Sequence, residues 1–342
     1  MKLHFDTDYM RGAHPEVMKR LAQTNMLQTP GYGTDLFTRK ARGLIRKACG
    51  LPRADVFFLT GGTQTNMTVI DAVLDSHEGV VCAESAHINV HESGAIESTG
   101  HKVLTLPSHQ GKIDVDELDK YVSDFYADDT YEHMVAPGMV YISYPTEFGT
   151  LYTFEELKAL NAVCKKHRLP LFIDGARLAY GLAANKEVSL QDLAGLCDVF
   201  YIGGTKAGAL FGEAVVVTKP NLIKYIVPNV KRHGALMAKG RLLGVQFETL
   251  FTDNLYQRLG ESAVECARLL KEGMKEKGYK VFIDSPTNQQ FFMLPNDVID
   301  RLLNDVCTFE YWGPRGKEES VVRFVTDWAT TKKDIEKVLS AL

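Results

Sequence analysis

The sequence lacks long hydrophobic runs, paired cysteines and a hydrophobic leader. No apolar run approaches the roughly 18 residues that mark a membrane-spanning helix, so no membrane partner is expected. The first residues hold neither a hydrophobic core segment nor a small-residue cleavage site, and we therefore expect a cytoplasmic protein. The six cysteines are widely spaced without a C-x-x-C pair, which predicts buried small hydrophobic side chains and no zinc site built from cysteines.

An excess of positive charge is also missing. The 39 lysines and arginines are balanced by 43 aspartates and glutamates, so the formal net charge of −4 favours no broad basic surface for nucleic acid. Neither a G-x-G-x-x-G dinucleotide motif nor a Walker A motif is present. The 342 residues, 45% of them apolar, have the composition of a globular protein of about two domains.

Short apolar segments alternate with longer amphipathic ones through most of the chain. This alternation predicts an α/β fold with a mostly parallel central sheet and helices on both faces. We expect strands at 56–59, 79–83, 138–143, 169–173, 198–202 and 213–217, and helices at 66–74 and 154–167.

The last hundred residues have a different pattern. A long helical stretch from about 239 to 277 precedes three short apolar segments at 279–283, 290–294 and 320–325. We therefore expect an N-terminal arm over residues 1–40, a large domain over 41–238 and a small C-terminal α/β domain over 239–342.

Three of the expected strands end in chemically suggestive residues, and parallel sheets bind ligands at that edge. Thr60-Gly61-Gly62-Thr63 precedes a helix and could bind a phosphate or form only a tight turn. Asp174 could pair with a protonated pyridine nitrogen or cap a helix. Lys206, within Gly203-Gly204-Thr205-Lys206, could form a Schiff base or belong to a surface loop. Together, the three are what pyridoxal 5'-phosphate (PLP) requires.

The same segments resemble a known family. Asp174-Gly175-Ala176-Arg177-Leu178 and Gly203-Gly204-Thr205-Lys206 are similar to motifs of the low-specificity L-threonine aldolases, within the beta-eliminating lyase group of fold type I PLP-dependent enzymes. The resemblance covers nearly the whole chain and implies the transferase-like fold of those enzymes. Further matching segments lie at 31–35, 86–92, 143–150, 238–241 and 322–326.

The resemblance implies roles at the cofactor. Lys206 would hold PLP covalently, Asp174 would pair with the pyridine nitrogen, and Gly62 and Thr63 would hold the phosphate. His87 would stack on the ring and is a candidate for moving the proton of the substrate β-hydroxyl.

The resemblance also implies roles at the substrate and between subunits. Arg177, which is expected beside the cofactor as well, and Arg323 would clamp the substrate carboxylate because guanidinium binds carboxylates bidentately. Thr7 stands where many relatives have a serine hydroxyl. Lys231 or Arg232 would reach the phosphate of a neighbouring subunit, as in a homodimer or homotetramer with shared active sites.

The implied reaction is cleavage of L-threonine, L-allo-threonine or a related β-hydroxy-α-amino acid to glycine and an aldehyde, through an external aldimine and a quinonoid. The chain departs from many relatives by having Ala207 after the lysine, and from some by having Thr146-Glu147 where they carry a histidine. These departures leave acetaldehyde and a larger aromatic aldehyde both open as products.

Other functions remain open from the residues alone. A β-eliminating lyase or an aminotransferase would use the same Asp174 and Lys206. His87 and His91 are four residues apart and could share a helix face, but the glutamate follows the second histidine, so a zinc hydrolase motif is absent and no metal is expected. A non-catalytic binding protein is disfavoured because the lysine, the aspartate and both arginines are all present.

Overall fold

The computed structural model describes residues 2–220 and 222–342, and its largest layer is a seven-stranded sheet. The strand order is β2-β8-β7-β6-β5-β3-β4, and β8 alone runs in the direction opposite to the other strands of this sheet. The mostly parallel sheet is thereby confirmed. The strands are β2 (Asp55–Leu59), β3 (Glu78–Ala83), β4 (Lys102–Leu106), β5 (Ala136–Ser143), β6 (Leu171–Asp174), β7 (Val199–Gly203) and β8 (Glu213–Val217).

Alternate side chains of each central strand enter two separate hydrophobic cores, one on each face. In β5, Val140 and Ile142 join one core, and Met139 and Tyr141 join the other. Because both faces are covered, the strands are almost continuously apolar, as expected for parallel strands. Helices α3 (Gly62–Val73) and α9 (Ile226–Arg232) pack on the second core.

The first core is covered by more helices, and α6 illustrates why they form. Thr153 and Glu156 make a reciprocal capping box at its start, and Arg168 ends it in the left-handed conformation. The helices that contribute to this core include α2 (Leu36–Ala48), α5 (Val115–Ala127), α6 (Phe154–His167), α7 (Leu178–Ala184), α8 (Leu190–Leu196) and α10 (Arg241–Leu250). A short helix α4 (His87–Val90) and two 3₁₀ turns, at Glu97–Thr99 and Tyr131–His133, lie in the connections.

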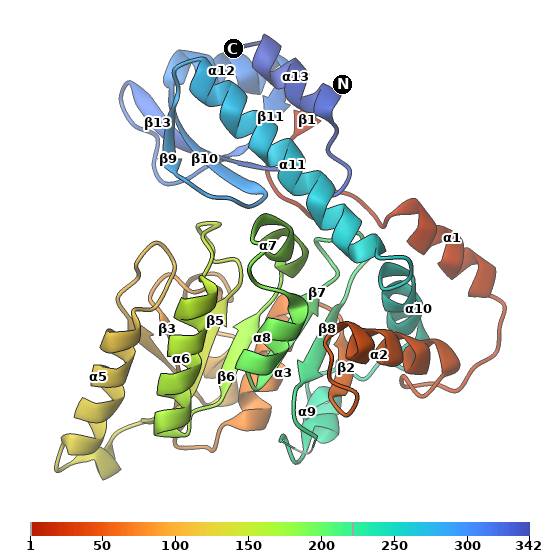
Figure 1. The fold of residues 1–342 in the computed structure, drawn as a ribbon, viewed down its shortest axis with the longest axis vertical. Coiled ribbons are helices and arrows are strands. Elements are labelled where there is room, and N and C mark those ends of the chain that lie inside the picture. The colour runs from red at the N-terminus through yellow and green to blue at the C-terminus, as the bar shows by residue number, and fades with distance from the viewer. Residues whose placement is uncertain (1, 221) are drawn as a thin grey trace.

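A second, antiparallel sheet lies at the other end of the molecule (Figure 1). Its strand order is β12-β13-β10-β9, and a third hydrophobic core fills the space between this sheet and its helices. The elements are α11 (Leu255–Glu276), β9 (Lys280–Ile283), β10 (Gln289–Pro295), α12 (Asn296–Asp305), β11 (Cys307–Thr308), β12 (Glu310–Tyr311), β13 (Glu319–Val325) and α13 (Lys332–Ser340).

The N-terminal segment crosses between the two sheets. Its short strand β1 (Leu3–His4) pairs with β11, and Phe5 enters the third core. The chain then runs past the large sheet to α1 (Pro15–Thr24), which lies beside α10 (Figure 1). This course places the residues after Phe5 between the two sheets.

Several expected elements are confirmed at their bounds, among them the helix at 154–167 and the strand at 213–217. The continuous helical stretch expected at 239–277 is wrong. Asp253 and Asn254 have positive φ angles of 52° and 55°, and this break separates α10 from α11. The domain boundaries at 40 and 238 stay predictions, although residue 40 falls inside α2.

All six cysteines are buried and free, as expected. Among the described residues, no helix combines the length and the low polarity needed to cross a bilayer.

Candidate active site

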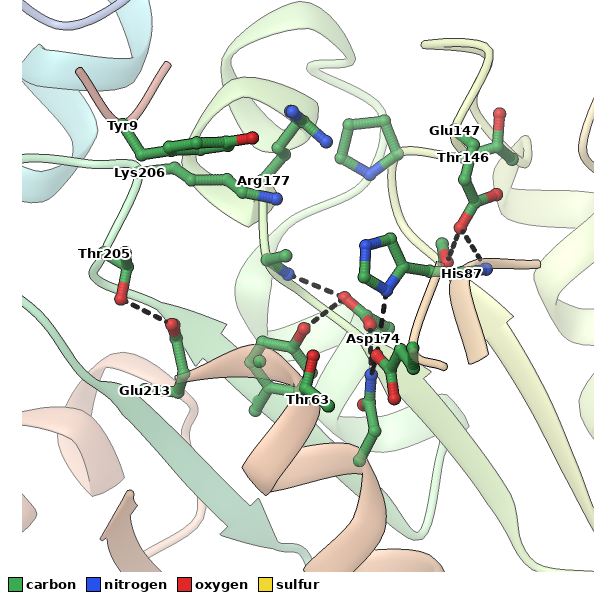
Figure 2. Close-up of a pocket in the computed structure, with 17 residues that line it drawn as sticks. Tyr9, Thr63, His87, Thr146, Glu147, Asp174, Arg177, Thr205, Lys206 and Glu213 are labelled. Atoms are coloured by element: carbon green, nitrogen blue, oxygen red, sulfur yellow. Dashed lines mark hydrogen bonds and ion pairs between the residues drawn. The ribbon is translucent and has the colours of Figure 1, made fainter. Parts of the chain in front are cut away.

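A cavity of about 260 Å³ opens at the edge where the strands of the large sheet end (Figure 2). Ser143 ends β5, Asp174 ends β6, and Lys206 follows β7. Because β8 is antiparallel, its first residue, Glu213, faces the same edge. The cavity wall also includes Tyr9, Gly62, Thr63, Asn66, His87, Glu92, Pro145, Thr146, Glu147, Ala176, Arg177, Tyr201 and Thr205.

Asp174 is buried and held by four hydrogen bonds. Oδ1 accepts from the Tyr201 hydroxyl at 2.5 Å and from the Ala176 amide at 2.9 Å. Oδ2 accepts from the Tyr141 hydroxyl at 2.6 Å and from Asn66 Nδ2 at 3.0 Å. Burial alone would raise the pKa of Asp174, but the donors from Tyr141 and Tyr201 outweigh burial and lower the pKa below its ordinary value. The site therefore holds a carboxylate anion.

Lys206 follows a loop that is tied back to β8. Glu213 accepts hydrogen bonds from the Gly204 amide at 3.0 Å and the Thr205 hydroxyl at 2.6 Å. The main-chain carbonyl of Lys206 accepts from the Tyr180 hydroxyl at 2.5 Å. Figure 2 shows the lysine chain beneath the Tyr9 ring, whose centroid lies 6.0 Å from Nζ. Burial and the nearby Arg177 charge lower the pKa of Lys206, which favours a nucleophilic amine.

The start of α3 is suited to an anion. Gly61 is the N-cap and has no side-chain oxygen with which to cap the amides of the first turn. A side chain at position 62 would crowd the hydroxyl of Tyr201, because a Cβ there would lie 3.3 Å from that oxygen. The glycines thus leave space in front of the helix for a phosphate.

His87 lies at the start of α4 and lines the same cavity. Its Nδ1 is 2.8 Å from Glu92 Oε1, and 38% of its side chain is exposed. Glu147 accepts from the His87 amide at 3.0 Å and from the Ser143 hydroxyl at 2.7 Å. Burial raises the pKa of Glu147 above that of an ordinary glutamate.

Arg177 enters the cavity but one edge of its guanidinium is already used. Nε lies 2.8 Å from Asp8 Oδ2 and an Nη 3.0 Å from Oδ1, and Asn288 also donates to Asp8 at 3.0 Å. Burial would lower the pKa of Arg177, but the Asp8 carboxylate outweighs that effect and raises it. The N-terminal segment therefore fixes this arginine in place.

The structure does not bring every expected residue to the cavity wall. Lys206, His87, Asp174, Gly62, Thr63 and Arg177 line it, whereas Thr7 and Arg323 do not.

Arg323 lies further into the second sheet. Its guanidinium donates to Gln289 at 3.1 Å, pairs with Glu310 and lies 5.3 Å from the ring centroid of Trp312. Burial and the neighbouring charge of Arg177 lower the pKa of Arg323.

Lys231 and Arg232 also lie away from the cavity of their own chain. The Lys231 amine is 4.8 Å from the centroid of the Tyr32 ring, and Arg232 pairs with Asp71.

His91 does not complete a metal site with His87. Their ring centroids are 5.6 Å apart, and the described residues contain no group of three histidine, cysteine or acidic side chains placed to hold a metal ion.

Several site residues were not predicted from the sequence. Tyr141 and Tyr201 lie within the strands expected at 138–143 and 198–202, and the hydroxyl of each donates to Asp174. Asn66 in α3, Glu92 in the loop after α4 and Glu213 at the start of β8 are buried polar residues. The available signal in the sequence was Glu213, a charged residue at the start of an otherwise apolar strand.

Known structures share this fold. Serine palmitoyltransferase from S. paucimobilis, solved with bound PLP-myriocin aldimine, is 16% identical, with a TM-score of 0.70 over 99% of this chain and 85% of that one. The Leishmania major threonine aldolase structure is 42% identical, with a TM-score of 0.94 over 99% of this chain and 98% of that one. The fold is thus that of the fold type I PLP-dependent enzymes.

The sequence comparisons specify the family. Residues 4–296 match the beta-eliminating lyase family, and the chain belongs to it. A low-specificity L-threonine aldolase of Pseudomonas aeruginosa is 31% identical over 98% of this chain and 94% of its own.

Proposed function

We propose that this protein is a PLP-dependent aldehyde-lyase that cleaves L-threonine, L-allo-threonine or a related β-hydroxy-α-amino acid to glycine and an aldehyde. One observation carries the proposal: the buried carboxylate that ends β6 and the lysine that follows the neighbouring strand β7 line one cavity. The Pseudomonas aeruginosa and Leishmania major relatives support the same reaction.

The cavity residues fit PLP. Asp174, held as an anion, would pair with the pyridine nitrogen, and the uncapped start of α3 at Gly62 and Thr63 would take the phosphate. Lys206 would hold the cofactor covalently, and its lowered pKa supports that role. When bound, PLP supplies the electron sink that makes the Cα–Cβ bond of the substrate cleavable.

The substrate would be oriented by arginine. Asp8 takes only one edge of the Arg177 guanidinium, so its remaining N–H groups can bind a carboxylate. Arg323 and Thr7 would complete the carboxylate site, with Arg323 reaching it from the second sheet. His87, which lines the same cavity, would take the proton of the β-hydroxyl.

Assembly into a homodimer or homotetramer would complete the phosphate site. Among the described residues that line the cavity, only Lys206 and Arg177 are lysine or arginine, and the lysine is reserved for the covalent bond. Lys231 or Arg232 of a second subunit would supply the missing charge. Exposed apolar side chains in the first 40 residues support an interface there: Met10, Met18, Met26, Leu27, Tyr32 and Leu36.

We place the enzyme in the cytoplasm.

The test is an assay of PLP-saturated protein with L-threonine, L-allo-threonine and phenylserine, each measured for glycine and aldehyde. We expect cleavage of at least one, and the ranking will define whether the pocket favours a methyl or an aromatic substituent. Absence of cleavage for all three, while amino acids still change the cofactor spectrum, would overturn the proposal in favour of elimination or transamination.

A further inference from the structure

A chain of buried hydrogen bonds connects Asp174 to His87. Asn66 Nδ2 donates to Asp174 Oδ2 at 3.0 Å and to Glu92 Oε1 at 2.8 Å. Glu92 Oε1 in turn lies 2.8 Å from His87 Nδ1. Figure 2 shows the other ring nitrogen of His87 directed away from this chain, toward the part of the cavity that holds Lys206 and Arg177.

The donors and acceptors of this chain determine where its protons lie. Asn66 meets a carboxylate on both sides, so its amide nitrogen, the donor, must face them. Glu92 Oε1 therefore already accepts one N–H. The side chain of Glu92 is fully buried, and Oε2 has no hydrogen-bond partner among the described residues, so a proton on Oε2 would have no acceptor.

The remaining proton lies between Glu92 Oε1 and His87 Nδ1. Nε2 is then the ring nitrogen that carries a lone pair into the cavity. A histidine held by a buried acceptor at one nitrogen and open at the other is arranged as a general base.

Resting on the proposed function, we propose that Glu92 is a positioning residue that keeps a proton on His87 Nδ1, so that His87 Nε2 takes the β-hydroxyl proton. In this step the O–H bond pair becomes the second bond of the aldehyde carbonyl. The Cα–Cβ bond pair would be accepted by the electron sink that bound PLP supplies. One proton leaves the hydroxyl and one is added to Cα of glycine, so the overall reaction is proton-neutral. Asn66 sets the spacing between the two buried carboxylates.

Glu147 is the competing base because it lines the same cavity. Two donors already bind its Oε1, and burial favours its protonated form. A carboxyl oxygen that already accepts two hydrogen bonds is less available to a substrate hydroxyl than an imidazole nitrogen that is open to the cavity.

The first test does not depend on activity. Protein labelled with ¹⁵N-histidine and loaded with PLP is examined by NMR, and the His87 signals are identified by their loss in His87→Phe. We expect a protonated Nδ1 and a bare Nε2 in the wild type. In Glu92→Leu, which removes the acceptor, we expect the proton to move to Nε2. A wild-type His87 protonated on Nε2, or an unchanged spectrum in Glu92→Leu, would overturn the proposal.

The second test separates positioning from a structural role. We expect Glu92→Leu to lower kcat by about 10²–10⁴-fold while KM changes less than about three-fold, because proton transfer is lost and binding is retained. Glu92→Gln keeps a carbonyl acceptor and is expected to recover at least about ten-fold of that loss. Equal kcat values for Gln and Leu, or a change confined to KM, would contradict the proposal.

Two further variants complete the design. Glu97→Gln is the control for Glu92→Gln, because it replaces glutamate by glutamine at an exposed position five residues further along the chain. We expect it to leave kcat unchanged. If Glu147→Gln abolishes cleavage while Glu92→Leu does not, Glu147 is the base and the proposal is wrong. A wild-type enzyme that cleaves no β-hydroxy-α-amino acid would refute the proposed function, whereas the NMR result would still report the position of the proton.

Discussion

At the scale of single residues, the chemistry of the cavity depends on how burial and hydrogen bonding oppose one another. Asp174 and Glu213 are both buried near Lys206, yet their pKa values move in opposite directions. Two tyrosine hydroxyls and an amide hold Asp174 as an anion. Burial raises the pKa of Glu213 to about 7, even though Thr205 and Gly204 donate to it.

The raised pKa of Glu213 predicts that the stability of the protein without cofactor depends on pH. Glu213 binds a proton more tightly in the folded protein than in the unfolded chain. Its protonation therefore adds to the free energy of unfolding in full below the ordinary pKa of 4.5, and this stabilisation is lost as the pH rises through about 7. We expect the free energy of unfolding of the wild type, relative to Glu213→Gln, to fall by up to roughly 3 kcal/mol over that window. Urea titrations of both apoproteins at about pH 5 and about pH 8 measure it. A difference that stays constant, or grows with pH, would refute the raised pKa.

Lys206 carries the covalent role in this account. We expect Lys206→Ala to lose the yellow absorbance of the lysine-bound cofactor and all cleavage activity, because no other lysine lines the cavity among the described residues. Absorbance spectra and a glycine assay on the dialysed, PLP-treated variant measure both. Full activity in this variant would remove Lys206 from the mechanism.

Arg323 was expected to bind the substrate carboxylate, but it is not among the described residues that line the cavity. We expect Arg323→Ala to raise KM by about 10- to 100-fold while PLP still binds, since a hydrogen bond to a charged group is worth about 1.5–3 kcal/mol. Arg315→Ala is the matched control, because Arg315 is exposed and pairs with Asp300. If KM in Arg323→Ala equals that of the control, Arg323 does not bind the carboxylate.

At the scale of elements, the sequence indicated the strands and helices where pattern and capping agree. The capping box of α6 and the apolar run of β8 are local signals, and both elements have the expected bounds. The break between α10 and α11 depends on the left-handed Asp253 and Asn254, which a helical hydrophobic pattern does not reveal. Likewise, β4 was not expected, and its five residues alternate between buried and exposed only in part.

The close approach of β6 and β7 at the cavity edge gives a prediction for an element boundary. A Cβ on Gly175 would lie 1.8 Å from the Tyr201 carbonyl oxygen, so Gly175→Ala must push the two strand ends apart. We expect the free energy of unfolding to fall by about 1–3 kcal/mol and PLP to bind more weakly. Thermal unfolding and cofactor titration measure these effects.

A helical glycine provides the control for this substitution. Gly43 lies within α2, and a Cβ there would have no atom within 4 Å. Gly43→Ala is therefore expected to be neutral or to stabilise by up to about 1 kcal/mol. Equal behaviour of the two alanine variants would show that the strand ends tolerate separation.

At the scale of the whole molecule, the site is assembled from distant parts of the chain. Asp174 and Lys206 were predictable because each follows a recognisable strand. The Asp8–Arg177 pair joins residues 169 positions apart, and the bond between Asn66 and Asp174 joins residues 108 positions apart. Such contacts follow from the folded topology, and no local pattern in the sequence specifies them. In the N-terminal arm, Asp8 pairs with Arg177 and Tyr9 lines the cavity, and the expected contact of Thr7 with the substrate stays a prediction.

The central claim is that the enzyme breaks the Cα–Cβ bond, and the products from L-threonine test this most directly. PLP-saturated protein is incubated with L-threonine, and all carbon products and ammonia are quantified, with Lys206→Ala as the blank. We expect glycine and acetaldehyde in equal amounts and no ammonia. Formation of 2-oxobutyrate and ammonia, with no glycine, would mean that the same cavity catalyses elimination and that the Cα–Cβ bond is not the one broken.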